Sequence, residues 1–533
     1  MGKEEIPKWL ILNEDGTKSV KEGSAEIIFD DQVFYNPIQE FNRDMSIAAI
    51  KIWSQIYLKE KLEKKNKKQE LNPDIYNVPK EDFKPFMTEK QLKKRDLQIN
   101  SMLESAKTSE YKPVNVEHSD FDEYGLTIME ALSASGLRSV RYAKEIPKVS
   151  KILTNDLSKD AVKSIERNAK HNKVDGIVQP NHGDACKVLY TGPEYDVIDL
   201  DPYGSAAPFL DSAVQAVADG GLLCVTCTDL AVLAGSQPES CWAKYGGMNI
   251  PQAPYTHELA LRILLHSIQS IASRYKKAIV PLISCHIDYY VRVFVRVYNS
   301  AQLMKQSSSK TSMIYHCQQC KSFETQTIGK YMETDKGPKF GPSALEINST
   351  CQHCSHKMHI AGPFYSHPIH DKEFVSRMLG HIATNQSRYG TWERMAGMVM
   401  VISEELPNPL YYVLPRMCGV MKCVSPSLTT FISGLLSTGY KVSQSHAMVQ
   451  AIKTDAPSHV VWDVIRQWCK ENPQKGEISE TSPAKIIMSK QITSEVSFET
   501  RKDAVAPSSK FNLVRFQENP TANWGPKVQI INS

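Results

Sequence analysis

The chain has 533 residues, a formal net charge of +4 at pH 7, and a composition that is 41% hydrophobic and 23% charged. This length is more than one hydrophobic core usually organises, so we expect at least two domains. The balance of apolar and charged residues excludes a largely disordered chain. Because the net charge is small, any surface that binds a polyanion has to be local.

Membrane insertion and secretion are both disfavoured by the sequence. Even the apolar stretch 220–235 is interrupted by Asp229, so we expect no membrane span. The first residues include Glu4, Glu5 and Pro7, where a secretion signal needs a basic and then an apolar run. Twelve dispersed cysteines in such a chain favour free thiols or a metal site over a disulfide framework.

The first part of the chain divides into an extension and an arm. We expect residues 1–58 to pack as an N-terminal extension on the domain that follows, and residues 59–120 to form a basic insertion. Residues 59–68 read KEKLEKKNKK, with six lysines against two glutamates, and Lys93-Lys94-Arg95 lies further along. Such a segment is either a solvated charged helix or a nuclear-import or RNA-contacting element, and its composition does not decide between them.

Residues 121–300 have the pattern of an α/β domain. Short aliphatic runs alternate with amphipathic stretches, which predicts a parallel sheet with crossover helices. Residues 255–275 lack Gly and Pro and repeat apolar residues at helical spacing, so we expect a helix packed on the core. The predicted strands lie near 127–130, 151–154, 177–180, 196–200, 222–226, 278–284 and 289–298.

A second domain of α+β type is expected over 312–475. The serine-rich piece 306–311 is typical of a linker, and the strand-helix alternation stops after it. The predicted helices of this domain are 371–383, 392–405 and 427–437. Residues 476–533 are polar and irregular, with basic and aromatic residues interleaved. We interpret them as a polar C-terminal tail, with an RNA contact as the alternative.

A metal site is predicted in the second domain. Cys317 and Cys320 form one C-x2-C pair, and Cys351 and Cys354 form another thirty residues later. Two such pairs can supply four thiolates to one tetrahedral zinc ion, which leaves no open position for catalysis, so we expect a structural site. Alternative ligands are His316, His353, His356 and His359. Cys224 and Cys227 share the spacing but lie in a predicted strand, where they point to opposite faces as core thiols.

Acidic residues end three successive strands of the α/β domain. Glu130 precedes a tight turn with the single glycine Gly136, at the position where such sheets bind nucleotides. Asp156 ends the next strand and could accept hydrogen bonds from ribose hydroxyls. At the third strand, Asp184 could accept from an adenine amine while the amide of Ala185 meets a ring nitrogen. Each acid alone could be surface solvation, but the three together predict an adenosine site.

The next strand delivers Asp201, Pro202 and Tyr203 at the same edge of the sheet. An exocyclic base amine is a poor nucleophile because its lone pair is delocalised into the ring, so a catalyst must align it and take its proton. Asp201 could do this. Pro202 fixes the turn and offers a carbonyl, and Tyr203 offers an aromatic plane for stacking. The alternative is an ordinary acidic turn before a helix.

Over most of its length the chain resembles a known family, the tRNA (guanine-26,N2) dimethyltransferases within the class I methyltransferases. The motifs that carry the resemblance are FYNPIQEFNRDMS, EALSASGLRSVRYAKEI, TNDLS, GDA, DPYGSAAPFLDSA, CTDLAVLAG, SLTTFISGLLSTGYKVSQSHA and IKTDAP. The family commonly has Phe where this chain has Tyr203, which keeps the ring and adds a hydroxyl. The resemblance implies a Rossmann-like methyltransferase domain followed by a zinc-containing domain that binds tRNA.

The resemblance also implies roles for single residues. Arg43 and Arg138 would hold S-adenosylmethionine together with Asp156, Asp184 and Ala185, with Glu130 as a further candidate. Phe34 and Tyr203 would sandwich an extruded guanine, beside Pro202 and the catalytic Asp201. Without the resemblance, Arg43 would be interpreted as helix-surface charge and Phe34 as a core residue.

The implied activity is methyl transfer to the N2 amine of guanine 26 of tRNA, giving N2,N2-dimethylguanosine. We expect tRNA as the partner, a monomer, and a nuclear location with a mitochondrial pool as a second expectation, although the acidic start is not typical of a transit peptide. Two alternatives remain open at this stage. One is a methyltransferase of the same class acting on another RNA base amine, and the other is a non-catalytic zinc-containing RNA-binding protein.

Overall fold

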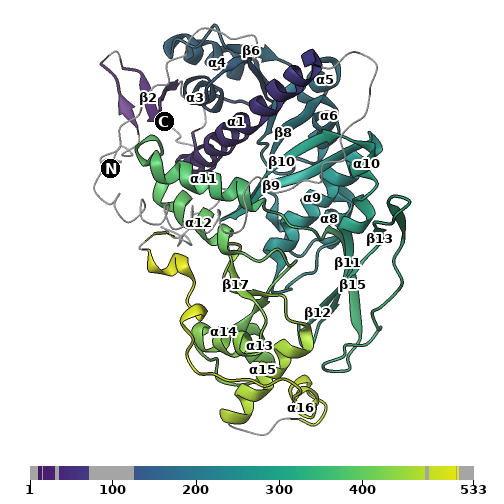
Figure 1. Cartoon of the computed structure of the whole chain (residues 1–533). Coiled ribbons are helices and arrows are strands. Elements are labelled where there is room, and N and C mark those ends of the chain that lie inside the picture. The colour runs from purple at the N-terminus through teal and green to yellow at the C-terminus, as the bar shows by residue number, and fades with distance from the viewer. Residues whose placement is uncertain are drawn as a thin grey trace.

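The computed structural model describes residues 10–14, 16–29, 35–70, 125–473, 479–511 and 513–514, with side chains masked over 62–70. The protein has an α/β part built on a large sheet and a smaller part below it that contains α13 to α16 (Figure 1). Phe34, most of the predicted basic arm and the end of the predicted tail lie outside the described residues. Within the described ranges, no helix is both long and apolar enough to cross a bilayer.

A seven-stranded sheet forms the centre of the α/β part. Its order is β6-β5-β4-β7-β8-β10-β9. The pairs from β6 to β8 are parallel, while β10 runs antiparallel to both β8 and β9. The strand order reverses between β4 and β7, which is where open α/β sheets bind ligands. The strands are β4 (Leu126–Glu130), β5 (Val149–Asp156), β6 (Val178–His182), β7 (Tyr195–Leu200), β8 (Val217–Cys227), β9 (Lys277–Ile287) and β10 (Tyr290–Asn299).

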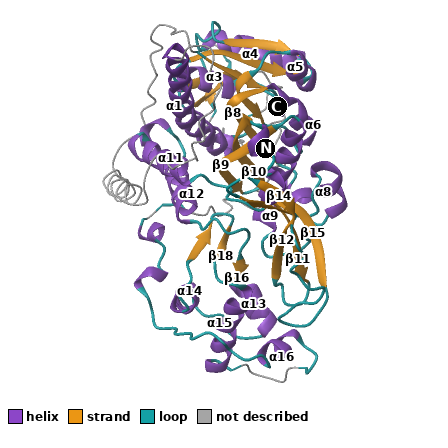
Figure 2. Ribbon diagram, turned by 45° about the vertical axis from the view of Figure 1, so that its right-hand side comes forward, coloured by secondary structure: helices purple, strands orange, loops and turns teal. Residues whose placement is uncertain are grey.

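Helices cover both faces of this sheet (Figure 2). One buried apolar cluster joins the sheet to α1, α3 and α4, and a second joins its other face to α5, α6 and α9. Cys224 belongs to the first cluster and Cys227 to the second, which confirms that they are core thiols on opposite faces. The helices are α3 (Leu137–Glu145), α4 (Lys159–His171), α5 (Ala185–Thr191), α6 (Ala207–Ala216), α7 (Leu230–Leu233), α8 (Pro238–Tyr245) and α9 (Thr256–Arg274).

The described residues before α1 pack on the sheet domain, and the boundary predicted at residue 58 stays a prediction. Their strands β1 (Ile11–Leu12), β2 (Lys18–Glu22) and β3 (Ala25–Phe29) form an antiparallel sheet. The amide of Ile28 in β3 donates to Oδ1 of Asn168 in α4 at 3.0 Å. A 3-10 turn, η1 (Pro37–Gln39), then leads into the long helix α1 (Glu40–Glu70).

The first residues of the lysine-rich segment continue α1. Lys61 lies 2.8 Å from Oδ1 of Asp196, and Glu60 pairs with Arg296 at 2.6 Å. These ion pairs attach the helix to β7 and β10, so the helical interpretation holds for the described part of the segment. Residues 71–120 lie outside the described ranges.

The C-terminal half contains three small sheets and several helices. The serine-rich piece that predicted a linker is a short connection, α10 (Ala301–Met304) and η2 (Ser307–Lys310), leading directly into β11. The sheets are β12-β11-β15, β13-β14 and β16-β18-β17. Their strands are β11 (Thr311–Cys317), β12 (Phe323–Thr327), β13 (Gly329–Met332), β14 (Lys339–Pro342), β15 (Met358–Tyr365), β16 (Tyr412–Val413), β17 (Val442–Ser445) and β18 (Met448–Thr454).

Two helices of this half, α11 and α12, lie against α1 (Figure 1). They share the apolar cluster of the large sheet, whereas α13 to α16 surround a separate cluster that includes the four predicted zinc ligands. The domain boundary at residue 312 stays a prediction. The helices are α11 (Lys372–Thr384), η3 (Gln386–Arg388), α12 (Trp392–Glu404), α13 (Leu414–Met421), α14 (Leu428–Ser437), α15 (Ser458–Glu471), α16 (Pro483–Met488), η4 (Lys502–Ala504) and η5 (Pro507–Lys510).

The described part of the predicted polar tail is attached to the domain. Asp463 of α15 accepts hydrogen bonds from the backbone and side chains of Thr493 and Ser494 at 2.9 to 3.1 Å. Ser508 donates to Glu404 at the end of α12. Polar composition in this segment therefore reflects hydrogen bonds to the domain surface.

Candidate active site

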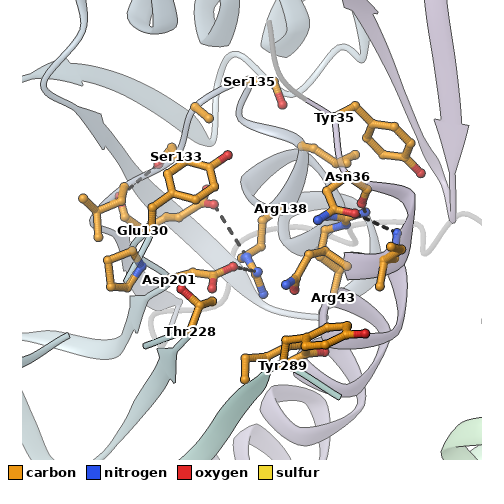
Figure 3. Close-up of a pocket in the computed structure, with 18 of the residues that line it drawn as sticks. Tyr35, Asn36, Arg43, Glu130, Ser133, Ser135, Arg138, Asp201, Thr228 and Tyr289 are labelled. Carbon is orange, nitrogen blue, oxygen red and sulfur yellow. Dashed lines mark hydrogen bonds and ion pairs between the residues drawn. The ribbon is translucent and has the colours of Figure 1, made fainter. Parts of the chain in front are cut away.

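A pocket of about 170 Å³ opens at the carboxyl ends of β4, β7 and β8, at the switch point of the sheet (Figure 3). The N-terminal segment before α1 and the turn between β9 and β10 close its other sides. The described residues that line it are Tyr35, Asn36, Ile38, Gln39, Arg43, Glu130, Leu132, Ser133, Ala134, Ser135, Leu137, Arg138, Asp201, Pro202, Tyr203, Thr228, Asp288, Tyr289 and Tyr290.

The loop between β4 and α3 forms one wall of the pocket. Gly136 has φ of 76°, and its missing Cβ would lie 3.2 Å from Ile165, so the turn favours glycine. Ala134 also has a positive φ, 48°, which is uncommon for a residue with a side chain. Oδ2 of Asp156 accepts a hydrogen bond from the Ala134 amide at 2.9 Å and holds this turn. Asp156 therefore lies beside the loop without lining the pocket itself.

Asp184 and Ala185 lie at the next strand end, outside the pocket lining. Asp184 is exposed and caps α5, accepting from the Lys187 amide at 3.0 Å, while Ala185 is buried. The amide of the preceding Gly183 donates to the Asp156 carbonyl at 3.1 Å. The structure thus brings Asp156, Asp184 and Ala185 to one edge of the sheet, next to the pocket.

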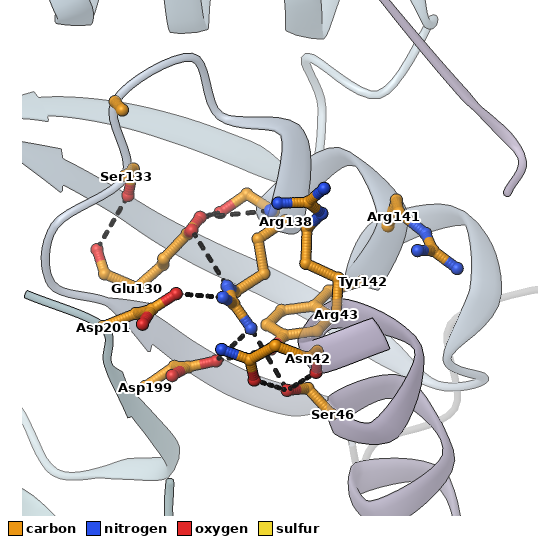
Figure 4. A network of polar contacts seen from close by, with 12 residues as sticks. Asn42, Arg43, Ser46, Glu130, Ser133, Arg138, Arg141, Tyr142, Asp199 and Asp201 are labelled. Carbon is orange, nitrogen blue, oxygen red and sulfur yellow. Dashed lines mark hydrogen bonds and ion pairs between the residues drawn. The ribbon is translucent and has the colours of Figure 1, made fainter. Parts of the chain in front are cut away.

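Arg138, the second residue of α3, connects the acidic side chains of the pocket. One terminal nitrogen pairs with Asp201, the other lies 3.6 Å from Asp199 and 3.1 Å from the Ser46 hydroxyl, and Nε lies 3.8 Å from Glu130 (Figure 4). Arg138 is only 5% exposed. Its charge is therefore shared among three carboxylates, of which Asp201 is the closest.

Glu130 is the most deeply buried acid of the pocket lining. It accepts from the amide of Ser139 at 3.1 Å and also from its hydroxyl. Burial raises the pKa of Glu130 to about 8, because Arg138 and the Ser139 donors only partly offset the loss of water. Glu130 is consequently a proton-bearing acid over much of the neutral range.

Asp201, Pro202 and Tyr203 follow β7 in the order that the sequence predicts. The Asp201 carboxylate faces the pocket toward Arg138 (Figure 3). The Tyr203 side chain is 78% exposed, so its ring is open at the mouth of the pocket. The Gly204 amide donates to the Thr228 hydroxyl at 2.7 Å, which ties this turn to the end of β8. A planar base could stack on Tyr203 within reach of Asp201.

Arg43 lines the pocket from the first turn of α1, where a buried acid fixes it. Nε lies 2.6 Å from Oε1 of Glu22, and one Nη contacts both Oε2 of Glu22 and the Asn36 carbonyl. Burial acts to raise the pKa of Glu22, but Arg43 and Arg141 outweigh it and lower that pKa to about 2. Nη1 of Arg43 makes no hydrogen bond within the described residues. Arg43 can therefore still bind an anionic group.

A second buried ion pair supports the site from below. Arg292 of β10 binds both oxygens of Asp199 at 2.7 and 2.9 Å, and it also donates to the Ser46 hydroxyl. Burial would raise the pKa of Asp199, but Arg292 and Arg138 outweigh it and lower that pKa. Tyr142 donates to the same carboxylate at 2.5 Å. Asp199 and Ser46 thus connect Arg292 to Arg138, whose contacts with these two residues are drawn in Figure 4.

Comparison with known proteins identifies the family. The chain matches the family described as N2,N2-dimethylguanosine tRNA methyltransferase over residues 14–466. The tRNA (guanine(26)-N(2))-dimethyltransferase of Schizosaccharomyces pombe is 45% identical, over 96% of this chain and 92% of its own length. The mitochondrial tRNA (guanine(26)-N(2))-dimethyltransferase of Saccharomyces cerevisiae is 37% identical, over 97% and 93%. The chain belongs to the N2,N2-dimethylguanosine tRNA methyltransferase family.

A solved structure shares the fold of this family member. Trm1 of Pyrococcus horikoshii, in complex with S-adenosyl-L-methionine, superposes with a TM-score of 0.62 at 23% identity. The match covers 84% of this chain and 99% of the archaeal chain. It confirms the predicted Rossmann-like methyltransferase fold.

The chain also carries the predicted cysteine cluster. Cys317, Cys320, Cys351 and Cys354 are buried, and their sulfur atoms all lie within 4.8 Å of one another. The Sγ atoms of Cys317 and Cys354 are 3.3 Å apart, too far for a disulfide. Four thiolates around one zinc ion stand about 3.8 Å apart, given Zn–S bonds of about 2.3 Å. The cluster therefore fits a zinc ion, and no predicted histidine alternative joins it among the described residues.

Several pocket residues of this family member have no signal in the sequence. Asp288 and Tyr289 form the turn between β9 and β10, and Tyr290 begins β10; no recognisable motif marks this place in the sequence. Thr228 follows β8 at the same edge as Asp201, so the rule that ligands bind at strand ends could have found it. Phe34 was predicted but lies outside the described residues, while its neighbour Tyr35 lines the pocket.

Proposed function

We propose that this chain transfers methyl groups from S-adenosylmethionine to the N2 amine of guanine 26 in tRNA, giving N2,N2-dimethylguanosine. The observation that carries the proposal is the carboxylate of Asp201, which faces a pocket at the sheet's switch point and is oriented by Arg138. Membership of the family over most of the chain supports the substrate.

The residues around the pocket fit the cofactor. S-adenosylmethionine, when bound, supplies a methyl group on a positively charged sulfonium. Arg43 keeps Nη1 for an anionic group such as the methionine carboxylate, and a charge-assisted bond there would orient the cofactor. Asp156 and Asp184, with the amide of Ala185, would hold the ribose and adenine at the adjoining strand ends.

Arg138 and Glu130 complete the proposed cofactor site. Both line the pocket on the side of the β4–α3 loop. Arg138 would bind the cofactor's polar end while it keeps its pairing with Asp201. Glu130 bears a proton in the neutral range, so it could donate a hydrogen bond there without adding negative charge.

The target base would be aligned by the residues after β7. An extruded guanine would stack on the exposed ring of Tyr203. The family resemblance places Phe34 on the opposite face of the guanine. The Asp201 carboxylate and the Pro202 carbonyl would accept hydrogen bonds from the N2 amine. Asp201 would then receive the N2 proton as the amine attacks, which keeps the nitrogen neutral. Two such transfers give the dimethylated product.

The C-terminal part would position the tRNA. We propose that the four cysteines hold a structural zinc ion that fixes the fold around α13 to α16. Phosphate contacts from this part would orient the substrate without reading its sequence.

We also propose that the protein acts as a monomer in the nucleus. The lysine-rich run 59–68 supports nuclear import, and the mitochondrial relative keeps a second, mitochondrial pool as part of the proposal. Light scattering of the purified protein and imaging of a tagged chain would test these points.

Nucleoside mass spectrometry of treated tRNA tests the activity directly. We expect N2-methylated and then N2,N2-dimethylated guanosine with tRNA bearing guanine 26, and no product when that base is adenine. Asp201→Ala should abolish transfer while tRNA affinity stays near that of the unchanged protein. Transfer to the adenine substrate would favour another base amine, and activity of the variant would remove Asp201 from the mechanism.

A further inference from the structure

The hydroxyl of Tyr290 is a buried polar group that the proposed mechanism does not use. Tyr290 is 3% exposed, and it lines the pocket together with Asp201 and Arg138. Its Oη has no hydrogen-bond partner within the described residues. Since buried hydroxyls in folded proteins are nearly always paired, this one needs an explanation.

The position of Tyr290 is firmly set by its surroundings. It begins β10, where it pairs with Ile287 across the turn from β9, and the next residue, Val291, pairs with Cys227 of β8. Asp288 at the tip of the turn has φ of 47° and forms an ion pair with Arg394 of α12 at 2.7 Å. The backbone that carries Tyr290 is therefore fixed on both sides of the turn.

Burial keeps the Tyr290 hydroxyl a donor. It raises the pKa of Tyr290, and, of the nearby charged groups, Arg394 and Arg292 lower that pKa while Asp288 and Asp201 raise it. The phenol therefore keeps its proton throughout the working pH range. It lies on the same sheet face as Arg292, two residues further along β10, which binds Asp199 beneath the active site.

A hydroxyl in this position is costly unless something binds to it. An unpaired buried donor loses its hydrogen bond to water on folding, and phenylalanine would fill the same space without that loss. A group that destabilises the free protein yet borders its ligand pocket is typical of a functional residue. A ligand bound in the pocket that Tyr290 lines could supply the missing hydrogen-bond acceptor.

We propose that Tyr290 is a base-reading residue whose hydroxyl donates a hydrogen bond to an acceptor atom of the target guanine. The inference rests on the proposed function, and it adds a fixed donor to the acceptors Asp201 and Pro202. Guanine offers three acceptors, O6, N3 and N7, whereas its N1 and N2 groups donate. A donor beside Asp201 would therefore complement the base and hold its N2 amine at the carboxylate.

Tyr290→Phe tests the hydroxyl alone. We expect kcat/KM for tRNA to fall about 10–100-fold, as for loss of a positioned hydrogen bond to the substrate. The thermal midpoint of the free protein should stay level or rise, and the affinity for S-adenosylmethionine measured by calorimetry should not change. A matched control is Tyr411→Phe, because the Tyr411 hydroxyl is also buried without a described partner but does not line the pocket. This control should be as active as the unchanged protein.

Base analogues in the target position identify the acceptor. tRNAs carrying 2-aminopurine, 3-deazaguanine or 7-deazaguanine lack O6, N3 or N7 respectively, while all keep the N2 amine. We expect the difference in kcat/KM between the unchanged protein and Tyr290→Phe to disappear for one of the three substrates and to persist for the other two. A difference that persists for all three would overturn the proposal. Equal activity of Tyr290→Phe and the unchanged protein on guanine tRNA would also overturn it, as would a lower thermal midpoint or weaker cofactor binding.

The same assay separates this inference from the proposed function. Absence of methylated guanosine with the unchanged protein would refute the function itself. Product formed at the same rate by the unchanged protein and by Tyr290→Phe would refute only the base-reading role.

Discussion

The guanidinium of Arg138 pairs with the carboxylate of Asp201, although the two residues lie 63 positions apart in the chain. Arg138 lies in the first turn of α3, which follows β4, and Asp201 follows β7; β4 and β7 are the two strands on either side of the switch point. The residue proposed to bind the cofactor is therefore in direct contact with the residue proposed to take the substrate's proton. The proposed binding and proton-transfer roles would therefore be carried by a single ion pair.

Arg138→Lys should impair catalysis more than folding. Lysine keeps the positive charge but lacks the planar fork that contacts Asp201, Asp199 and Ser46 together. Asp201 would lose its fixed orientation, and a misplacement of this kind costs on the order of 100-fold in rate. We expect kcat/KM to fall by about that factor while circular dichroism stays unchanged. Full activity of the lysine variant would show that charge alone is sufficient.

Asp199→Asn should destabilise the protein strongly. The Asp199 carboxylate is fully buried and balances Arg292 directly, so its removal leaves a buried guanidinium without its counter-charge. Loss of one partner of such a pair costs about 3–5 kcal/mol. Denaturant unfolding would measure this change. The control is Asp160→Asn, whose pair with Lys163 is exposed and should be worth less than about 1 kcal/mol. Similar effects for both variants would contradict the assigned importance of the buried pair.

Most strands of the large sheet are readable from the sequence because they are short aliphatic runs; β6, with the sequence VQPNH, is not one. The strand predicted at 222–226 begins earlier in the structure, at Val217. The prediction missed these first residues because Gly220 and Gly221 interrupt the apolar pattern. The first part of α1, before the lysine-rich run, was not predicted. Residues 41–50 are all buried, polar side chains such as Asn42, Asp44 and Ser46 included, so no exposed polar face sets off the apolar side of this helix in the sequence.

The site residues that directly follow strands of the large sheet could be predicted from the sequence. Asp201 and Asp156 follow strands whose carboxyl ends must meet at one edge, so their proximity follows from the sheet. The partner of Arg43 could not be found in this way, because Glu22 comes from a separate antiparallel sheet in the N-terminal extension. Tyr290 was expected as an ordinary strand residue. Its contact with the pocket depends on the turn that Arg394 holds, which no local pattern encodes.

Glu130→Gln should change how stability depends on pH. The pKa of Glu130 is raised from 4.5 to about 8 by burial, so the unfolded chain releases this proton first as the pH rises. The stability that the protonated group contributes is complete below pH 4.5 and is lost as the pH rises toward 8. Glutamine mimics the protonated acid and does not titrate. The variant should therefore gain stability relative to the unchanged protein across this window, by up to about 1.4 kcal/mol per pH unit.

Urea unfolding of both proteins at pH 5 and pH 8 measures the Glu130 effect. The difference in the free energy of unfolding should be small at pH 5 and should favour glutamine at pH 8. A difference that stays constant between the two pH values would show that Glu130 is already ionised in the folded protein. In that case Arg138 would fully compensate its charge.

Removal of the proposed zinc ion should destabilise the part around α13 to α16 and weaken tRNA binding. The four thiolates belong to the same apolar cluster as Trp462 and Leu435, so losing the metal would leave like-charged or protonated sulfurs in that core. We expect one zinc per chain by elemental analysis, a lower thermal midpoint after chelation, and both effects in Cys320→Ser. The control is Cys186→Ser, because Cys186 is half-buried on α5, away from the cluster. A metal-free protein with an unchanged midpoint would show that the cysteines pack as thiols, and tRNA affinity would then have to come from other elements.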